Sequence, residues 1–220
     1  MLKITNVKVY DLKESIIASG NAMRTQPVEY TNEEFDHGLD RMKKLVKACK
    51  TTGINCHDNA LTGIRVSFDV QYPQYWTPEF QRYHFVDIVT SSSKMHRLSK
   101  MDLNICCNEY VDKVIIDKLQ ALKDEYNRVL GDGNITCYNF FDERTGKIIE
   151  YKTREDVLYF LFMRLVSNCP LGLELFMRVS TNYKQLQTIY RQRKDHKLKE
   201  DWGAFCAMIE KLPYFEELIK

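Results

Sequence analysis

The stretch GIRVSFDV, residues 63–70, alternates apolar and polar side chains and is the clearest strand pattern in the chain. A β-strand turns successive side chains to opposite faces, so this alternation predicts a strand with one buried face. The apolar residues share one face and the polar residues share the other: Ile64, Val66, Phe68 and Val70 against Arg65, Ser67 and Asp69. A sheet is therefore expected in the fold.

The segments before this strand predict one more strand and two helices. Residues 4–10 alternate loosely, as a strand does, and residues 15–24, SIIASGNAMR, predict the start of a helix. Thr31 and Glu34 have the spacing of a capping box for the next helix, and Gly53 is placed to end it. Its apolar residues follow helical spacing: Phe35, Leu39, Met42, Val46 and Cys49.

The segments after the strand are mostly helical. Pro78 suits the first turn of a helix, and Thr153 with Asp156 suits a helix cap. Residues 132–152 form a candidate insertion whose pattern fits either a hairpin or an excursion that ends in a helix. The predicted helices cover five segments: 78–89, 109–130, 153–165, 170–193 and 201–212. Together these patterns predict an α+β fold, a helix-rich single domain over residues 1–220 with one small antiparallel or mixed sheet.

The bulk composition is that of a soluble globular protein. A net charge of +2 on 220 residues is too small to predict nucleic-acid or membrane binding, so any anion site has to be local. The longest apolar run, residues 157–163, is too short to span a bilayer, and the first residues do not resemble a signal peptide. The odd number of cysteines, seven, has no framework spacing and favours free thiols in a reducing compartment. We therefore expect a cytoplasmic protein.

Most familiar chemical motifs are missing from the sequence. It contains neither GxxxxGK[ST] nor GxGxxG, and neither CxxC nor HExxH, so no metal site is predicted. The basic run at 191–199, RQRKDHKLK, is most simply the solvated end of a helix, where cations are favourable. Arg193 has a different interpretation, because it also belongs to a longer pattern.

That pattern joins three distant segments. His57 precedes the strand at 63–70 by a short interval, and residues 82–94 read Arg-x-His, seven residues, then Ser-x-Lys. Near the C-terminus, Arg164 and Pro170 precede Asn182-x-Lys184, which is followed by Arg193 and Trp202. In order and spacing these segments resemble the flavin-dependent thymidylate synthases. The resemblance touches residues 4–219 and is carried mainly by 50–98 and 160–212.

The sequence departs from the family pattern at several positions. His84, Lys94 and Lys184 stand where the family has arginine, and Thr90 stands where it has an acid. All three cation changes weaken bidentate phosphate binding, and the missing acid removes a partner for base recognition. The family's Glu-His pair falls on Thr62 and Gly63.

The resemblance implies reductive methylation of dUMP, or of a related pyrimidine nucleotide, with FAD as cofactor and with methylenetetrahydrofolate and NADPH as co-substrates. It also implies a homo-oligomer, expected to be a homotetramer. The implied cofactor-binding residues are His57, Arg82, His84, Asn182 and Lys184. The implied nucleotide-binding residues are Ser92, Lys94, Arg164 and Arg193, of which Ser92 and Arg193 would also act in catalysis.

Two other functions stay open at this point. A non-catalytic homologue would keep the fold and bind a nucleotide or a protein partner, and the substituted signature positions favour it. A helical interaction protein without a ligand is the third alternative. Arg164 follows a strongly apolar run, so its burial is expected, and its partner would be a ligand or an acid such as Glu174.

Overall fold

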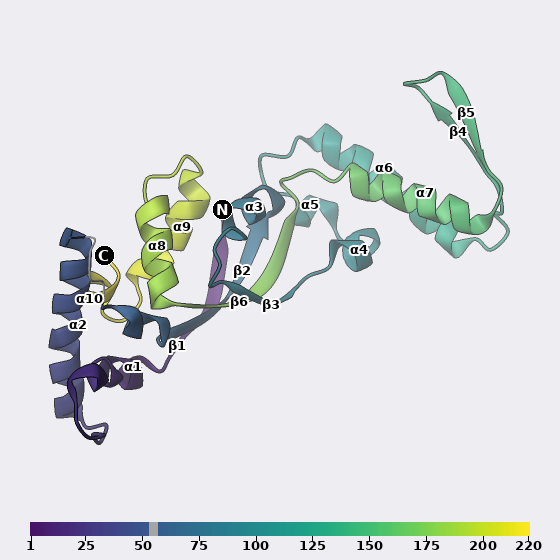
Figure 1. Ribbon diagram of the computed structural model, residues 1–220. Helices are drawn as coiled ribbons and strands as arrows, with labels where there is room; N and C mark the ends of the chain where they lie inside the picture. Colours follow the sequence, from purple (N-terminus) through teal and green to yellow (C-terminus); the bar gives the residue numbers. More distant parts are fainter. Residues whose placement is uncertain (53–56) are drawn as a thin grey trace. The chain divides into compact units, whose positions relative to one another are not determined.

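The computed structural model describes residues 1–52 and 57–220 (Figure 1). The chain forms two compact units. Unit 1 consists of Met1–Tyr72, Trp76–Ser91 and Phe176–Lys220, and unit 2 consists of Pro73–Tyr75 and Ser92–Leu175. The single domain expected over residues 1–220 thus has two compact parts, and its folding as one domain stays a prediction.

A four-stranded sheet lies at the centre of unit 1. Its strands are β1 (Lys3–Tyr10), β2 (Arg65–Pro73), β3 (Asp87–Ser91) and β6 (Glu174–Asn182), in the order β1-β2-β6-β3. The pairs β1–β2 and β3–β6 are antiparallel. β2 confirms the strand predicted from GIRVSFDV, and β1 confirms the one predicted at 4–10.

One face of this sheet is buried under aromatic side chains. Val66, Phe68 and Val70 of β2 are buried, and the residues between them are partly exposed. Phe68 lies edge-on to Phe205 at 5.6 Å between ring centroids. The core continues through stacked and tilted rings: Trp76, Phe80 and Trp202. Burying such rings is worth about 3–5 kcal/mol each against alanine, which makes this the main source of stability in unit 1.

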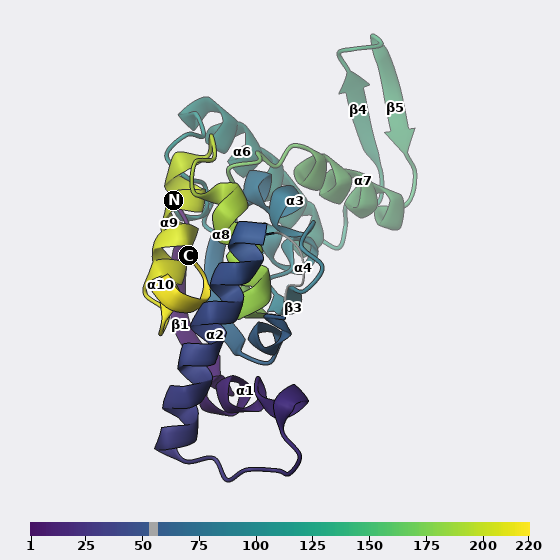
Figure 2. The ribbon, with the colours of Figure 1, turned by 60° about the vertical axis from the view of Figure 1, so that its left-hand side comes forward.

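Helices at both ends of the chain complete unit 1. They are α1 (Leu12–Ala18), α2 (Asn32–Thr52), α3 (Thr77–Phe80), α8 (Tyr183–Arg193), α9 (Lys199–Glu210) and α10 (Phe215–Leu218), with the short 3-10 helices η1 (Asn21–Met23) and η2 (Asn59–Thr62) among them. The 3-10 helix η3 (Gln74–Trp76) lies where the chain returns from unit 2 to unit 1. α1 packs on α2, and both views show them side by side (Figures 1 and 2). Gly53, expected to end α2, lies outside the described residues.

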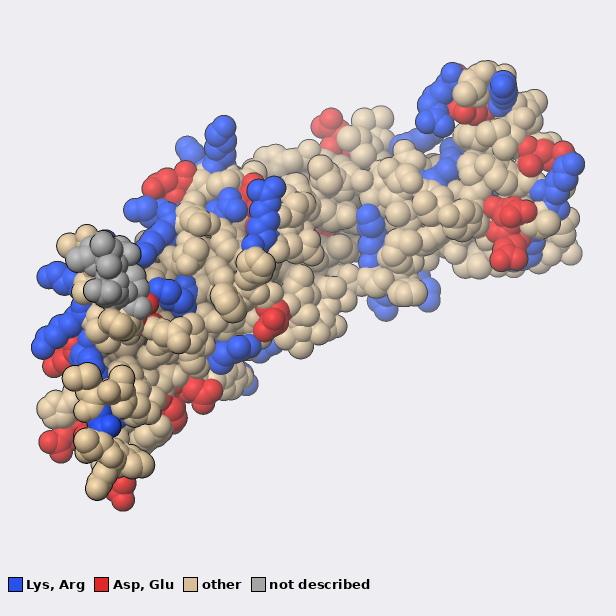
Figure 3. Space-filling view, in the orientation of Figure 1, with Lys and Arg blue, Asp and Glu red and all other residues tan. Residues whose placement is uncertain are grey.

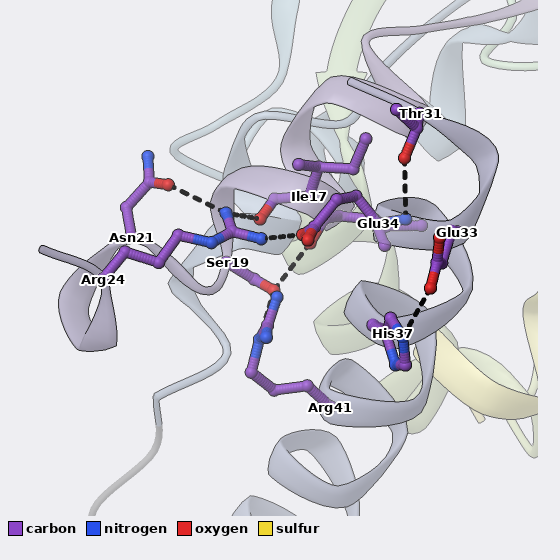
Figure 4. Close-up of polar contacts among 10 residues, drawn as sticks. Ile17, Ser19, Asn21, Arg24, Thr31, Glu33, Glu34, His37 and Arg41 are labelled. Atoms are coloured by element: carbon purple, nitrogen blue, oxygen red, sulfur yellow. Dashed lines mark hydrogen bonds and ion pairs between the residues drawn. The ribbon is translucent and has the colours of Figure 1, made fainter. Parts of the chain in front are cut away.

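Polar contacts tie α1 to α2 (Figure 4). The Arg24 guanidinium donates to the Ile17 carbonyl at 2.9 Å and forms an ion pair with Glu34. The backbone N–H of Glu34 donates to Thr31 Oγ1 at 3.1 Å, which confirms half of the predicted capping box. The other half is missing because the Glu34 carboxylate turns to Arg24 instead.

Unit 2 pairs two long helices with a hairpin. Its elements are α4 (Lys94–Arg97), the 3-10 helix η4 (Leu98–Lys100), α5 (Leu103–Cys106), α6 (Lys113–Gly131), β4 (Tyr138–Asp142), β5 (Lys147–Tyr151) and α7 (Arg154–Ser167). α6 and α7 pack together over buried leucines. The Thr153 hydroxyl accepts from the Asp156 backbone N–H at 3.2 Å, confirming the predicted cap of α7. The candidate insertion is a hairpin, so residues 1–52 and 57–220 form two sheets where one was expected.

Two predicted helices are wrong. Residues 78–89 form only the short α3, then a turn, then the edge strand β3, whose β-branched residues Ile88, Val89 and Thr90 favour extended backbone. Residues 170–193 divide into β6 and α8. The Asn182 side chain caps α8, accepting from Gln185 N at 2.9 Å, so the helix starts there.

The remaining expectations concern thiols, charge and the membrane. Cys49 is disulfide-bonded, so the expectation of free thiols is wrong for this residue; the free cysteines are Cys106, Cys107, Cys137, Cys169 and Cys206. Among the described residues, no helix is both long and apolar enough to cross a membrane. On the face shown in Figure 3, basic and acidic side chains are interspersed.

Candidate functional site

Arg193, predicted to hold a nucleotide, lies at the C-terminal end of α8 in a network of polar and aromatic groups. Its Nη1 donates to Glu79 Oε2 at 2.9 Å, and its Nε donates to the Tyr83 hydroxyl at 2.7 Å. Its guanidinium carbon lies 4.6 Å from the centroid of the Trp202 ring. The side chain is 14% exposed, so the position of the guanidinium is set by its neighbours.

Glu79 is the centre of this network. Its Oε2 also accepts from the indole N–H of Trp202 at 2.9 Å and lies 3.4 Å from Nε2 of His196. One carboxylate oxygen therefore organises three side chains from α8, α9 and the turn between them. The arrangement holds Arg193 rigid and also offsets its charge.

A cavity of about 370 Å³ adjoins Arg193. Most of its lining residues are basic: Arg193, Lys194, His196 and Lys199, with Asp195 and Gly203. Because Glu79 offsets the charge of Arg193, the lining's remaining permanent charges are those of Lys194 and Lys199 against Asp195, a small positive balance that suits an anion of modest size. The solvated helix end expected at 191–199 is thus partly a cavity wall.

The N-terminal end of α8 holds a second group of predicted residues. Asn182 is buried, and its side-chain oxygen accepts the hydrogen bond that caps α8. The Lys184 ammonium donates to Asp58 Oδ2 at 2.6 Å, and Asp58 is only 2% exposed. A buried carboxylate needs a cationic partner, so Lys184 stabilises the folded structure by pairing with Asp58. His57, the neighbour of Asp58, is exposed.

The segment around Arg82 contacts residues from both ends of α8. The Tyr83 hydroxyl donates to Gln192 Oε1 at 3.1 Å, and the Phe85 backbone N–H donates to Gln185 Oε1 at 3.3 Å. Arg82 and His84 alternate with these anchors, and both side chains are exposed. Within residues 1–52 and 57–220, neither forms a hydrogen bond or an ion pair.

Three predicted residues belong to unit 2. Lys94 donates to Gln74 Oε1 at 3.1 Å, and Ser92, which is half-buried, immediately precedes the cap of α4. Arg164 Nη1 lies 3.5 Å from Glu125 Oε2, and its guanidinium carbon is 4.5 Å from the centroid of Phe140. The acid beside Arg164 is Glu125; Glu174 was the expected one.

The Glu125 carboxylate has a second partner in unit 2. The Tyr138 hydroxyl of β4 donates to it, and burial together with this carboxylate raises the pKa of Tyr138 to about 12. Arg164, Glu125 and Tyr138 therefore link α7, α6 and the hairpin. The role of Ser92, Lys94 and Arg164 toward a nucleotide stays a prediction.

Two of the free cysteines have raised pKa values. Burial raises the pKa values of the half-buried Cys169 and the buried Cys206 to about 11 each, which disfavours the thiolate form of both side chains.

Several site residues had no signal in the sequence. No sequence motif includes Glu79, Asp58 or His196. Only the fold brings these three residues to α8. Tyr83 lies between two signature positions, and Trp202 follows Arg193 as in the family pattern, so these two had a weak signal.

Comparisons with known proteins support the fold alone. The sequence matches no known protein family profile, and no curated protein is similar to it in sequence. Among solved structures, the flavin-dependent thymidylate synthase ThyX of Helicobacter pylori, complexed with FAD and dUMP, has a TM-score of 0.63 at 11% identity. The match covers 99% of this chain and 98% of that one.

Two further structures match over most of their length. A second ThyX structure from Helicobacter pylori with FAD and dUMP has a TM-score of 0.61 at 12% identity, covering 100% of this chain and 98% of that one. The UMP/dUMP methylase PolB of Streptomyces cacaoi, bound with 5-Br dUMP, has a TM-score of 0.51 at 9% identity, covering 96% and 88%. The chain therefore has a ThyX-like fold.

Proposed function

We propose that this protein is a divergent flavin-dependent enzyme that methylates dUMP or a related pyrimidine nucleotide. One observation carries the proposal: the predicted ligand residues of unit 1 gather along α8, in a fold that matches structures holding FAD and dUMP. Arg82, His84 and Arg193 were implied by the family resemblance before the fold was known, and they come from segments about 100 residues apart.

The exposed residues of the Arg82 segment fit a flavin dinucleotide. FAD combines a diphosphate with a large flat ring. Arg82 is a guanidinium with no partner among the described residues, which suits a phosphate. His84 is exposed and Phe85 is 66% exposed, so both offer flat faces to a ring. His57 is our further candidate for contact with the cofactor.

When bound, FAD would supply the hydride chemistry, with NADPH as the reductant and methylenetetrahydrofolate as the carbon donor. The protein has to hold and orient the ligands. Arg193 is already oriented by Glu79 and Tyr83, and it is our candidate for binding the nucleotide and acting in catalysis. Ser92 is our separate candidate for the same two roles. Lys94 is proposed as a further contact to the nucleotide. For Arg164, which pairs with Glu125 and packs on Phe140, we propose a role in the packing of unit 2.

A second candidate function is a non-catalytic homologue that binds a nucleotide. A specific observation favours it: two cations at signature positions, Lys184 and Arg193, are neutralised by Asp58 and Glu79. A site with fewer uncompensated cations binds phosphates more weakly, whatever its fold. The resemblance also supports a homotetramer, which light scattering on the purified protein would test.

The first experiment is to titrate FAD into the purified protein and follow visible absorbance. We expect flavin bands that shift on binding, and an affinity that falls about 10-fold or more in Arg82→Ala because a charge-assisted phosphate contact is lost. Arg128→Ala, which removes an exposed arginine from α6, is the control and should bind FAD normally. Protein that binds no FAD would rule out the flavoenzyme.

The second experiment separates the two functions. Expression in a strain that requires thymidine should restore growth without thymidine if the protein makes thymidylate. Binding of FAD or dUMP by the purified protein, together with failure to restore growth, would instead favour the non-catalytic homologue or a different pyrimidine substrate.

A further inference from the structure

Unit 1 contains an apolar groove between β1 and α9, which we call the β1–α9 groove. Its volume is about 680 Å³, within the range of roughly 300–1,000 Å³ typical of small-molecule sites. β1 contributes Ile4, Val7 and Val9, and α9 with its C-terminal cap contributes Ala204, Ala207 and Lys211. β1 and α9 are in contact, and Figure 1 shows both labelled.

Small side chains on α9 and a bulge in β1 create the space. Ala204, Ala207 and Lys211 are spaced i, i+3 and i+7, so they share one helix face, which is the face toward β1. Alanine leaves room where a larger residue would fill the contact. On the opposite wall, the β1–β2 register shifts between Thr5 and Lys8, and this bulge leaves Val7 39% exposed.

The lining has one charged group. Lys211 is exposed at the C-terminal end of α9, and the lining includes no acid. Its ammonium makes no hydrogen bond or ion pair with any residue that the structure describes. A lysine at a helix C-terminus is favourable by itself, but here the uncompensated cation also stands at an apolar surface.

The same strand argues against protein occupants. β1 is an edge strand, and open edges invite pairing with another strand. Its bulge at Asn6 and Val7 interrupts the edge, and Lys3 and Lys8 add two positive charges with no acid between them. Pairing with β1 of a second copy would bring like charges together, which is unfavourable. The groove is therefore suited to a small ligand with a negative end.

We propose that the β1–α9 groove binds a small amphipathic carboxylate. Its apolar chain lies against Val9 and Ala207, and its carboxylate is held by the Lys211 ammonium. The groove shares no lining residue with the cavity beside Arg193, and this inference does not depend on the nucleotide chemistry proposed above.

Calorimetric titration of the full chain with dodecanoate, below its micelle concentration, tests the proposal. Lys211→Glu should weaken dodecanoate binding about 10-fold, because an attractive surface charge becomes repulsive, and should leave dodecanol binding unchanged. Ala207→Trp should weaken binding of both compounds about 10-fold or more, because the indole would occupy the part of the groove proposed to hold the apolar chain. Lys118→Glu, an equal charge change at an exposed position of α6, is the matched control and should bind dodecanoate normally.

Two outcomes would overturn the proposal. One is no binding of dodecanoate to the wild type, and the other is equal affinity in the wild type and Lys211→Glu. If the wild type binds no dodecanoate and light scattering shows that Ala207→Trp changes the oligomeric state, the groove is an interface between copies. Circular dichroism checks that Ala207→Trp folds, and the exposed Lys211→Glu keeps the test decisive if it does not.

Discussion

Arg193 in unit 1 and Arg164 in unit 2 have similar immediate surroundings. Each pairs with one glutamate, Glu79 or Glu125, and each guanidinium lies within 5.6 Å of the centroids of two aromatic rings. Both were predicted from sequence to bind a nucleotide. From the residue types alone the two arginines are indistinguishable.

The difference lies in what surrounds each ion pair. The Glu79–Arg193 pair adjoins a cavity whose lining is mostly basic. The Glu125–Arg164 pair connects α6 and α7 to the hairpin through Phe140 and Tyr138. Both arginines join several elements, since Glu79, Tyr83 and Trp202 link α3, α8 and α9 around Arg193. Arg193 also borders a cavity, which makes it the better candidate for contact with a ligand. The surroundings of the pair therefore indicate function better than the pair itself.

The largest expected effect is on ligand binding by Arg193→Ala. Loss of a charge-assisted, oriented contact should weaken dUMP binding roughly 100-fold by calorimetry. Arg193→Lys keeps the charge without the planar fork and should recover only part of the affinity. If Arg193→Ala binds dUMP as the wild type does, Arg193 does not bind the ligand, and the proposed difference between Arg193 and Arg164 is wrong.

Arg164→Ala should act on stability. Because the pair is partly exposed, we expect the free energy of unfolding to fall by about 2 kcal/mol, most of it from lost packing over Phe140 and Phe160. Urea unfolding measures it, and FAD affinity should stay unchanged. A large loss of dUMP affinity at unchanged stability would show that Arg164 binds the nucleotide after all.

Glu79→Gln and Glu125→Gln compare the two acids. Removing the Glu79 charge leaves Arg193 uncompensated, so dUMP should bind about 3-fold to 10-fold more tightly. Glu125→Gln should leave dUMP affinity unchanged. Parallel calorimetric titrations measure dUMP affinity in both variants. Equal changes in affinity would contradict the proposal that the two ion pairs differ in function.

The smallest effect is a pH dependence shared by both units. Tyr138 donates to Glu125 and Tyr190 donates to Glu210, and burial with these carboxylates raises each tyrosine pKa to about 12. Since the folded-state pKa exceeds the unfolded value near 10, the stabilisation is complete below pH 10 and is lost as the pH rises through 12. Urea unfolding between pH 9 and 12 should show this decline, and Tyr138→Phe should make it shallower. An unchanged decline in Tyr138→Phe would exclude Tyr138 as a source.

Local patterns predicted the elements whose signals lie within one segment. The alternation at 63–70 became β2, and Thr153 caps α7 as its spacing indicated. The helix predicted over 78–89 failed because helical spacing of apolar residues also occurs by chance in a short strand. There the sheet edge and the β-branched residues of β3 outweighed the local pattern.

The roles predicted for the site residues stay predictions. The family resemblance pointed to Arg82, Lys184 and Arg193, which the fold brings to α8, but nothing in the sequence indicated that Asp58 and Glu79 would neutralise two of them. Glu79 and Arg193 are 114 residues apart, so no local pattern contains both. Their pairing follows from how α3, α8 and α9 pack around Trp202.

By itself, the sequence determined the strand at 63–70, the cap of α7 and the spacing of the cations, because propensity, capping and periodicity act over a few residues. Only the tertiary structure decided which cations stay unpaired, which arginine borders a cavity, and that a groove opens between β1 and α9. These properties depend on charges and side-chain volumes from distant segments that meet only after the chain has packed.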